Sequence, residues 1–144
     1  MTIAAILREK GSAVVAVPPD ATLATLIDVL ARHRIGAVVV REPGGELLGI
    51  ISERDVIRAL SDHGSAALAT PVGDRMTRGV QCASRLTSDE DALETMTHGR
   101  FRHLPVIEDG RLVGLVSIGD VVKARLSQQA YEVDTLKAYV AGGM

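Results

Sequence analysis

The chain has 144 residues, of which 47% are hydrophobic and 24% are charged, and its net charge is −2 at pH 7. This composition is typical of a globular protein with one good core or two small interlocked ones, and the near-neutral net charge gives no electrostatic indication of DNA or RNA binding. The single cysteine excludes an internal disulfide, no apolar run approaches the ~20 residues of a membrane span, and the N-terminus lacks the apolar core of a signal peptide, so we expect a cytoplasmic protein.

The first half of the chain predicts the order strand, helix, strand, strand, helix after a short lead-in. The lead-in is a helix over residues 3–10 that Gly11 ends, and the β-branched run at 14–17 predicts a strand that two prolines stop. Apolar residues then recur at helical spacing after Thr22, which can cap their helix. The stripe that we expect to be buried is Leu23, Leu26, Ile27 and Leu30.

A hairpin and a second helix complete this half. Residues 37–40 and 46–51 predict two strands joined by the turn Pro43-Gly44-Gly45. Ser52 follows and opens a helix. Its inner face is expected to carry Val56, Ile57 and Leu60.

The second half of the chain predicts the same order again. Residues 80–84 form its first strand, Ser88 caps the helix that follows, and 104–107 and 111–116 form its hairpin. A helix then starts at Ser117. The core residues of the first helix are expected to be Ala92, Leu93 and Met96, and a separate last helix over 127–140 carries Val133, Leu136 and Val140 on one side.

The two halves share a sequence repeat. The segment that begins at Gly49 returns at Gly114, 65 residues later, with Gly, Ser, Asp and Val in the same places. This repeat predicts two similar units around a pseudo-twofold axis, and a site built from the shared residues should occur twice near their join. We divide the chain into a first unit with its lead-in (1–62), a connector (63–71), a second unit (72–126), and a C-terminal helix and tail (127–144).

The repeated Gly…Ser-x-x-Asp pattern suggests a chemistry. In the first copy, Gly49 would let a ligand approach the strand, and the Ser52 hydroxyl beside free amides at a helix N-terminus suits a phosphate. Asp55 can accept two hydrogen bonds from ribose hydroxyls, and Arg54 can pair with a phosphate. The same pattern is also a capping box, which stabilises a helix and binds nothing. Two copies, and an arginine that capping does not explain, favour a ligand-binding role.

At these residues the chain resembles a known family, the tandem pair of cystathionine-β-synthase (CBS) domains called a Bateman module. The resemblance runs from about Ile3 to Leu126. One family signature is a glycine, two apolar residues, Ser or Thr, two variable residues and Asp, and both copies are intact. The other is an apolar strand ending in proline, which fits residues 102–106, whereas the first unit has Val39 where the proline would stand.

The resemblance implies an α/β (α+β) fold of two βαββα repeats that pack sheet to sheet and leave two related clefts for adenosine-containing ligands. AMP is the first candidate, and ADP, ATP, NAD and S-adenosylmethionine are the others. By similarity, cleft 1 combines Ile50, Ser52, Arg54, Asp55, Thr77, Arg78, Gln81, Phe101 and Arg102. Cleft 2 combines Lys10, Gly11, Ser12, Val15, Ile35, Gly36, His103, Leu115, Ser117 and Asp120. Because Gly119 stands where the first copy has Arg54, the two clefts should bind phosphate unequally.

No catalytic or metal site is expected. The histidines lack metal-ligand spacing, and we expect His33, His63 and His98 in solvent. His103 follows a motif, and both a structural role and a site role stay open for it. Cys82 is expected in the core, and the spacing supplies no base that could activate a serine.

The function that these features favour is a stand-alone regulatory sensor of an adenine nucleotide, which reports energy or redox state to an unidentified downstream protein. Apolar helix faces exceed what one thin module can cover, and the family usually pairs its modules, so we expect a homodimer. Two alternatives stay open: a structural dimerisation module with empty clefts, and a weak nucleotide-processing enzyme. We expect neither a nucleic acid partner nor a membrane.

Overall fold

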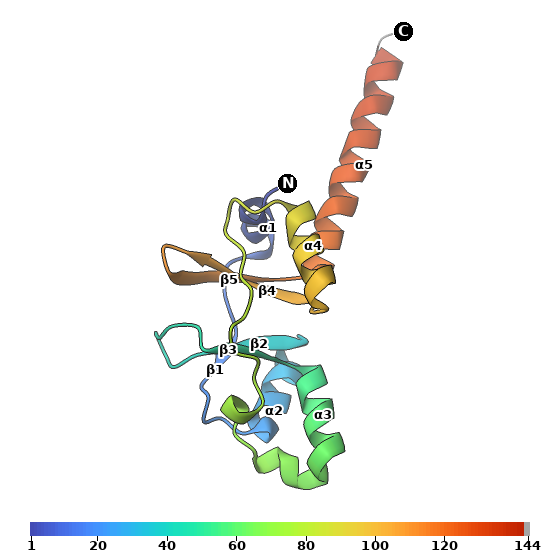
Figure 1. Cartoon of the computed structure of the whole chain (residues 1–144). Helices are drawn as coiled ribbons and strands as arrows, with labels where there is room; N and C mark the ends of the chain where they lie inside the picture. Colours follow the sequence, from blue (N-terminus) through green and yellow to red (C-terminus); the bar gives the residue numbers. More distant parts are fainter. Residues whose placement is uncertain (143–144) are drawn as a thin grey trace.

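Two small sheets face each other in the computed structural model, which describes residues 1–142, and helices cover the outer side of each sheet (Figure 1). The first sheet has three strands in the order β1-β2-β3 and the second has two, β4-β5. The mixed α/β fold expected from the sequence is confirmed. Each sheet presents one face to the other, so the two copies of the repeat come together where the sheets face each other (Figure 1).

The first unit keeps the predicted order of elements, with shorter strands. Its elements are β1 (Ala16–Val17), α2 (Leu23–His33), β2 (Ala37–Val40), β3 (Gly49–Ser52) and α3 (Glu53–His63). β1 pairs parallel to β2, and β2 pairs antiparallel to β3. Of the strand predicted at 14–17, only the last two residues form β1. β3 begins three residues later than the strand predicted at 46–51. The Thr22 side chain caps α2 by accepting from the Thr25 amide, as predicted.

The inner face of α3 differs from the prediction. Val56 is buried as expected, but Ala59 is the residue that packs beside it, while Ile57 is 65% exposed and Leu60 37% exposed. The reason is the helical period of 3.6 residues, which turns position 57 about 100° away from 56. On α2, Ile27 is also at the edge of the stripe and half-exposed.

The second unit contains α4 (Asp89–Gly99), β4 (His103–Glu108), β5 (Arg111–Ser117) and the start of α5 (Ile118–Gly142). β4 and β5 form an antiparallel hairpin with an irregularity between Val106 and Ile107. The lead-in helix α1 (Ile3–Lys10) packs on this unit, because Ile3 and the apolar residues one turn on join its core. The first helix of the chain therefore crosses to the second unit.

The predicted first strand of the second unit is wrong. Of residues 80–84, only Ala83 pairs, through one parallel bridge to Val106. The Ala83 amide donates to Pro105 O and its carbonyl accepts from Ile107 N, each at 2.8 Å. Since no neighbour pairs in register, the segment runs as an extended connection, and Cys82 is exposed instead of buried in the core.

The C-terminal region is one helix. α5 runs without a break where the sequence predicted a helix from Ser117 and another over 127–140, because no glycine or proline separates them. Figure 1 shows its distal part projecting beyond the rest of the molecule. The connector contains two short 3₁₀ helices, η1 (Gly64–Ala69) and η2 (Val72–Asp74). Residues 143–144 of the predicted tail lie outside the described residues.

Each unit has its own hydrophobic core. One lies under the three-stranded sheet, with Leu26 and Ile51 at its centre, and the other under the hairpin, with Met96 and Val116. Among residues 1–142, no helix has the length and apolar character needed to cross a bilayer.

Candidate functional site

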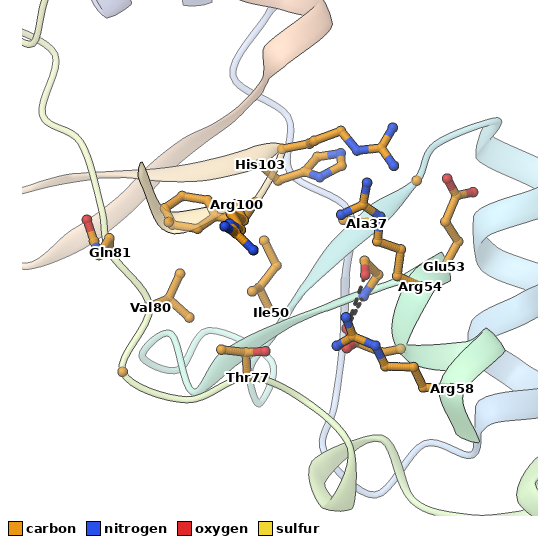
Figure 2. Close-up of a pocket in the computed structure, with 17 residues that line it drawn as sticks. Ala37, Ile50, Glu53, Arg54, Arg58, Thr77, Val80, Gln81, Arg100 and His103 are labelled. Atoms are coloured by element: carbon orange, nitrogen blue, oxygen red, sulfur yellow. Dashed lines mark hydrogen bonds between the residues drawn. The ribbon is translucent and has the colours of Figure 1, made fainter. Parts of the chain in front are cut away.

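A cleft of about 500 Å³ opens between the two units (Figure 2). A volume of this size falls in the range of small-molecule sites, ~300–1,000 Å³. Both units line it. The lining residues are Gly36, Ala37, Ile50, Ser52, Glu53, Arg54, Asp55, Arg58, Thr77, Gly79, Val80, Gln81, Gly99, Arg100, Phe101, Arg102 and His103.

Asp55 lies at the start of α3, where it also completes a capping box with Ser52. Its Oδ2 accepts from the Ser52 amide at 2.8 Å and from the Ser52 hydroxyl at 3.2 Å. Among the described residues, its other oxygen, Oδ1, has no hydrogen-bond partner. The two interpretations of the motif are therefore compatible, since capping uses one carboxylate oxygen and leaves the other for a ligand.

The glycine of the motif has a different role from the one expected. Gly49 does not line the cleft, and a Cβ at this position would lie 2.6 Å from Thr77 O. In the second copy, a Cβ at Gly114 would lie 2.7 Å from a methyl carbon of Leu7. The two glycines thus admit neighbouring protein segments, not a ligand.

Four arginines line the cleft, against two carboxylates. Arg54 and Arg58 come from α3, one helical turn apart, while Arg100 and Arg102 come from the segment between α4 and β4. In Figure 2, Arg54 and Arg58 extend from α3, and Arg100 lies on the side of the other unit. Within residues 1–142 none of the four forms an ion pair. Unpaired guanidinium groups in a cleft favour an anionic ligand.

Gly36 lies where Glu53 and His103 approach each other. A Cβ at Gly36 would lie 3.5 Å from a Glu53 carboxylate oxygen and 3.6 Å from the His103 ring. Burial lowers the pKa of His103, and the positive charges of Lys10 and Arg102 lower it further against the opposing effect of nearby carboxylates. The imidazole ring is therefore held mainly neutral at pH 7.

Most residues predicted for cleft 1 line this one cavity. They are Ile50, Ser52, Arg54, Asp55, Thr77, Gln81, Phe101 and Arg102. Arg78 does not; its side chain is exposed outside the cleft.

The residues predicted for cleft 2 are dispersed. Gly36 and His103 line the cleft just described, whereas Gly11 and Ser12 line a separate hollow of about 560 Å³ beside α1. Val15 and Ile35 pack against the core of the first unit. The remaining four, Leu115, Ser117, Asp120 and Lys10, line neither cavity.

Lys10 binds the motif residues of the second copy directly. Its ammonium nitrogen donates to Leu115 O at 2.6 Å and to Asp120 Oδ2 at 2.5 Å. Asp120 also accepts from the Ser117 amide at 2.8 Å. Burial alone would raise the pKa of Asp120, but the hydrogen bonds from Lys10 and Ser117 outweigh it and hold that pKa below its usual value.

Several cleft residues were not predicted from the sequence. Arg58 lies four residues after Arg54, and this spacing, which places two side chains on one helical face, could have identified it. Arg100 could not be found this way, because its position depends on its left-handed backbone (φ 56°) at the end of α4. Glu53, Val80 and the glycines at 79 and 99 complete the set.

The described residues contain no cluster of His, Cys, Asp or Glu that could hold a metal ion. His33, His63 and His98 are exposed, as predicted. Cys82 is exposed, and partial burial of its sulfur raises the pKa of the thiol, so the reactive thiolate is disfavoured.

Comparison with known proteins connects both units to one family. Residues 7–62 and 72–127 each match the CBS domain. The chain is 35% identical over 150 residues to the CBS domain-containing protein CBSX3, mitochondrial, of Arabidopsis thaliana, covering 99% of this chain and 73% of that protein. It is 29% identical to the CBS domain-containing protein YhcV of Bacillus subtilis, covering 81% and 82%.

Solved structures agree with this match. A CBS-domain containing protein from Agrobacterium tumefaciens superposes with a TM-score of 0.84 at 44% identity, covering 86% of this chain and 92% of that one. The structure of CBSX2 in complex with AMP superposes with a TM-score of 0.73 at 26% identity, covering 89% and 98%.

Proposed function

The chain belongs to the CBS domain family, and on that basis we propose that it is a non-catalytic sensor of an adenine nucleotide that signals to another protein. The observation that carries this proposal is the cleft between the units. It combines Asp55 Oδ1 with four arginines, and within the part of the chain that the structure describes neither the oxygen has a hydrogen-bond partner nor the arginines an ion-pair partner. The first suits a ribose hydroxyl, and the arginines suit phosphate.

AMP is the ligand that we propose first. CBSX2, a similar protein, was solved with AMP, and the cleft of this chain has the volume for a mononucleotide. Apolar and aromatic side chains of Ile50, Val80 and Phe101 line the same cleft and offer a surface for the adenine ring. ADP, ATP, NAD and S-adenosylmethionine are the alternatives.

A ligand in this position acts on both units at once. It touches α3 of the first unit and the segment before β4 of the second, so binding favours the relative orientation in which both sets of residues reach it. We propose that this change in orientation is the signal. The downstream protein is unidentified. We propose that the sensor is located in the cytoplasm.

We also propose that the protein is a homodimer. Helices α3 and α5 expose apolar side chains that the chain itself does not cover. They are Ile57, Leu60, Val122, Leu126, Val133, Leu136 and Val140. On α5, Leu126, Val133 and Val140 recur every seven residues, and Val122 and Leu136 accompany them, which is the pattern of a helix that pairs with another. A twofold arrangement of two identical chains satisfies it.

A thermal-shift screen tests the sensor proposal. AMP, ADP, ATP, NAD and S-adenosylmethionine at millimolar concentration should include at least one that raises the melting temperature, with GMP as the matched control. Incubation with ATP or NAD followed by product analysis tests the absence of catalysis. Stabilisation without turnover supports the sensor. No stabilisation by any of them favours a structural dimerisation module, and turnover favours an enzyme.

A further inference from the structure

The aspartates of the two motif copies accept hydrogen bonds from different donors. Among residues 1–142, the Asp55 side chain accepts hydrogen bonds only from Ser52, within its own turn, and it lines the open cleft. Asp120 accepts from its own turn and also from the ammonium group of Lys10, which lies 110 positions away in the sequence.

The Lys10 ammonium group makes a second hydrogen bond, to the backbone of β5. Lys10 also donates to Leu115 O at 2.6 Å, near the C-terminal end of strand β5 and two residues before Ser117. The corresponding carbonyl of the first copy, Ile50 O, accepts instead from the backbone amide of Thr77 at 2.9 Å. The Lys10 side chain therefore donates hydrogen bonds both to a backbone carbonyl of β5 and to the aspartate carboxylate of the second motif copy.

The helix end directs the side chain there. Lys10 is the last residue of α1, and Gly11 after it has a positive φ of 95°, which ends the helix. Ile3, Ile6 and Leu7 anchor α1 in the core of the second unit, so its C-terminal residue reaches β5. The residue 66 positions later, at the matching place before the second unit, is Met76, which has no charge.

We propose that the Lys10 ammonium group takes the place of a ligand at the second copy of the motif, beside Asp120, so that the chain binds one nucleotide, at Asp55. This inference rests on the proposed sensor function. The ammonium group pairs with Asp120 Oδ2, so its positive charge offsets the negative charge of the carboxylate that ribose hydroxyls would have to approach. It also joins α1 to β5 and α5, a connection that a bound ligand would otherwise supply.

The stoichiometry of AMP binding tests the inference, measured by equilibrium dialysis of AMP with the full chain. Wild type should take up one AMP per chain. Lys10→Met, which gives the first lead-in the residue found at position 76, should take up two. Lys10→Arg keeps a cation at the site and should stay at one. In the double variant Lys10→Met/Asp55→Ala, one AMP should remain, bound at Asp120.

Each outcome decides between the proposals. Two AMP per chain in wild type, or one in a folded Lys10→Met, overturns the assignment of Lys10 and leaves the sensor function intact. No uptake by either protein refutes the sensor function, and the assignment falls with it. If Lys10→Met does not fold, Lys10→Gln replaces it. A second readout is the His103 ring in NMR, whose pKa should rise once the charge of Lys10 is removed.

Discussion

Ile50 and Thr77 are joined by two backbone hydrogen bonds, 3.0 Å from Ile50 N to Thr77 O and 2.9 Å from Thr77 N to Ile50 O. Ile50 lies in β3 of the first unit, and Thr77 lies in the segment that leads into the second. This bridge fixes one wall of the cleft. It requires Gly49, because any Cβ there would lie 2.6 Å from Thr77 O.

Replacing Gly49 by alanine should therefore destabilise the fold. Forcing a methyl group against backbone typically costs about 1–3 kcal/mol, which lowers the melting temperature by several degrees. Gly114→Ala is the matched control, because its Cβ would meet the end of the flexible Leu7 side chain, which can move. Calorimetric unfolding of both variants decides this, and a loss for Gly114→Ala as large as that for Gly49→Ala would show the bridge to be unimportant.

Arg54 should set the preference of the cleft for phosphate. Arg54→Ala removes a guanidinium that has no protein partner in residues 1–142, so AMP should bind about tenfold more weakly, the lower end for a charge-assisted hydrogen bond at an exposed group. Adenosine should bind almost unchanged. Arg78→Ala, outside the cleft, is the control and should change neither. Equal losses for AMP and adenosine would remove Arg54 from the phosphate site.

His103 should make the unfolding free energy fall in mild acid. Its pKa in the folded state lies below the usual 6.5, so the unfolded chain binds the proton more readily. Its contribution to stability is complete above pH 6.5 and declines as the pH falls from there toward the folded pKa. The charged groups around the ring are Lys10, Arg102, Asp120 and Glu53.

Chemical unfolding at pH 7.5 and pH 5.5 measures this effect. His103→Gln removes the titrating group and should lose less stability between the two pH values than wild type does. AMP should reduce the difference as well, because a bound phosphate offsets the positive charges that lower the pKa of His103. An unchanged pH dependence in His103→Gln would contradict the assignment.

The exposed stripe on α5 should hold two chains together. Light scattering at micromolar concentration should give about twice the 15.2 kDa of one chain. A truncation after Leu126 keeps the buried Val121 and Ala124 and removes the projecting part of α5. If that part pairs, the truncated protein should be a folded monomer. A dimer that survives truncation would place the interface on α3 and the start of α5 instead.

The sequence predicted best the features that depend on neighbouring residues. The caps at Thr22 and Ser88, the end of α1 at Gly11, and the hairpins follow from local preferences, and the structure has them all. Because similar segments fold into similar elements, the sequence repeat also predicted that the chain forms two similar units.

The predictions that failed depend on contacts between distant parts of the chain. Residues 80–84 have the composition of a strand, but only Ala83 finds a partner. The role of Gly49 depends on where Thr77 passes, and the contact of Lys10 with Asp120 spans 110 positions. The repeat in the sequence predicted two related clefts, unequal only in the arginine that Gly119 replaces. A single lysine, without a counterpart in the second unit, adds a further difference that the repeat could not reveal.

The central claim, that the cleft binds an adenine nucleotide through Asp55, is tested most directly by calorimetric titration of AMP into wild type and Asp55→Ala. Wild type should bind AMP, and a hundredfold excess over the dissociation constant should add about 2.7 kcal/mol to its stability. Asp55→Ala should bind about ten- to a hundredfold more weakly, since hydrogen bonds to a charged group contribute about 1.5–3 kcal/mol. Loss of the cap lowers the stability of the free variant, so the comparison is made at a temperature where both proteins are folded. Wild type should also discriminate against 2′-deoxy-AMP, and no heat of binding, or equal binding of AMP by both proteins, would contradict the claim.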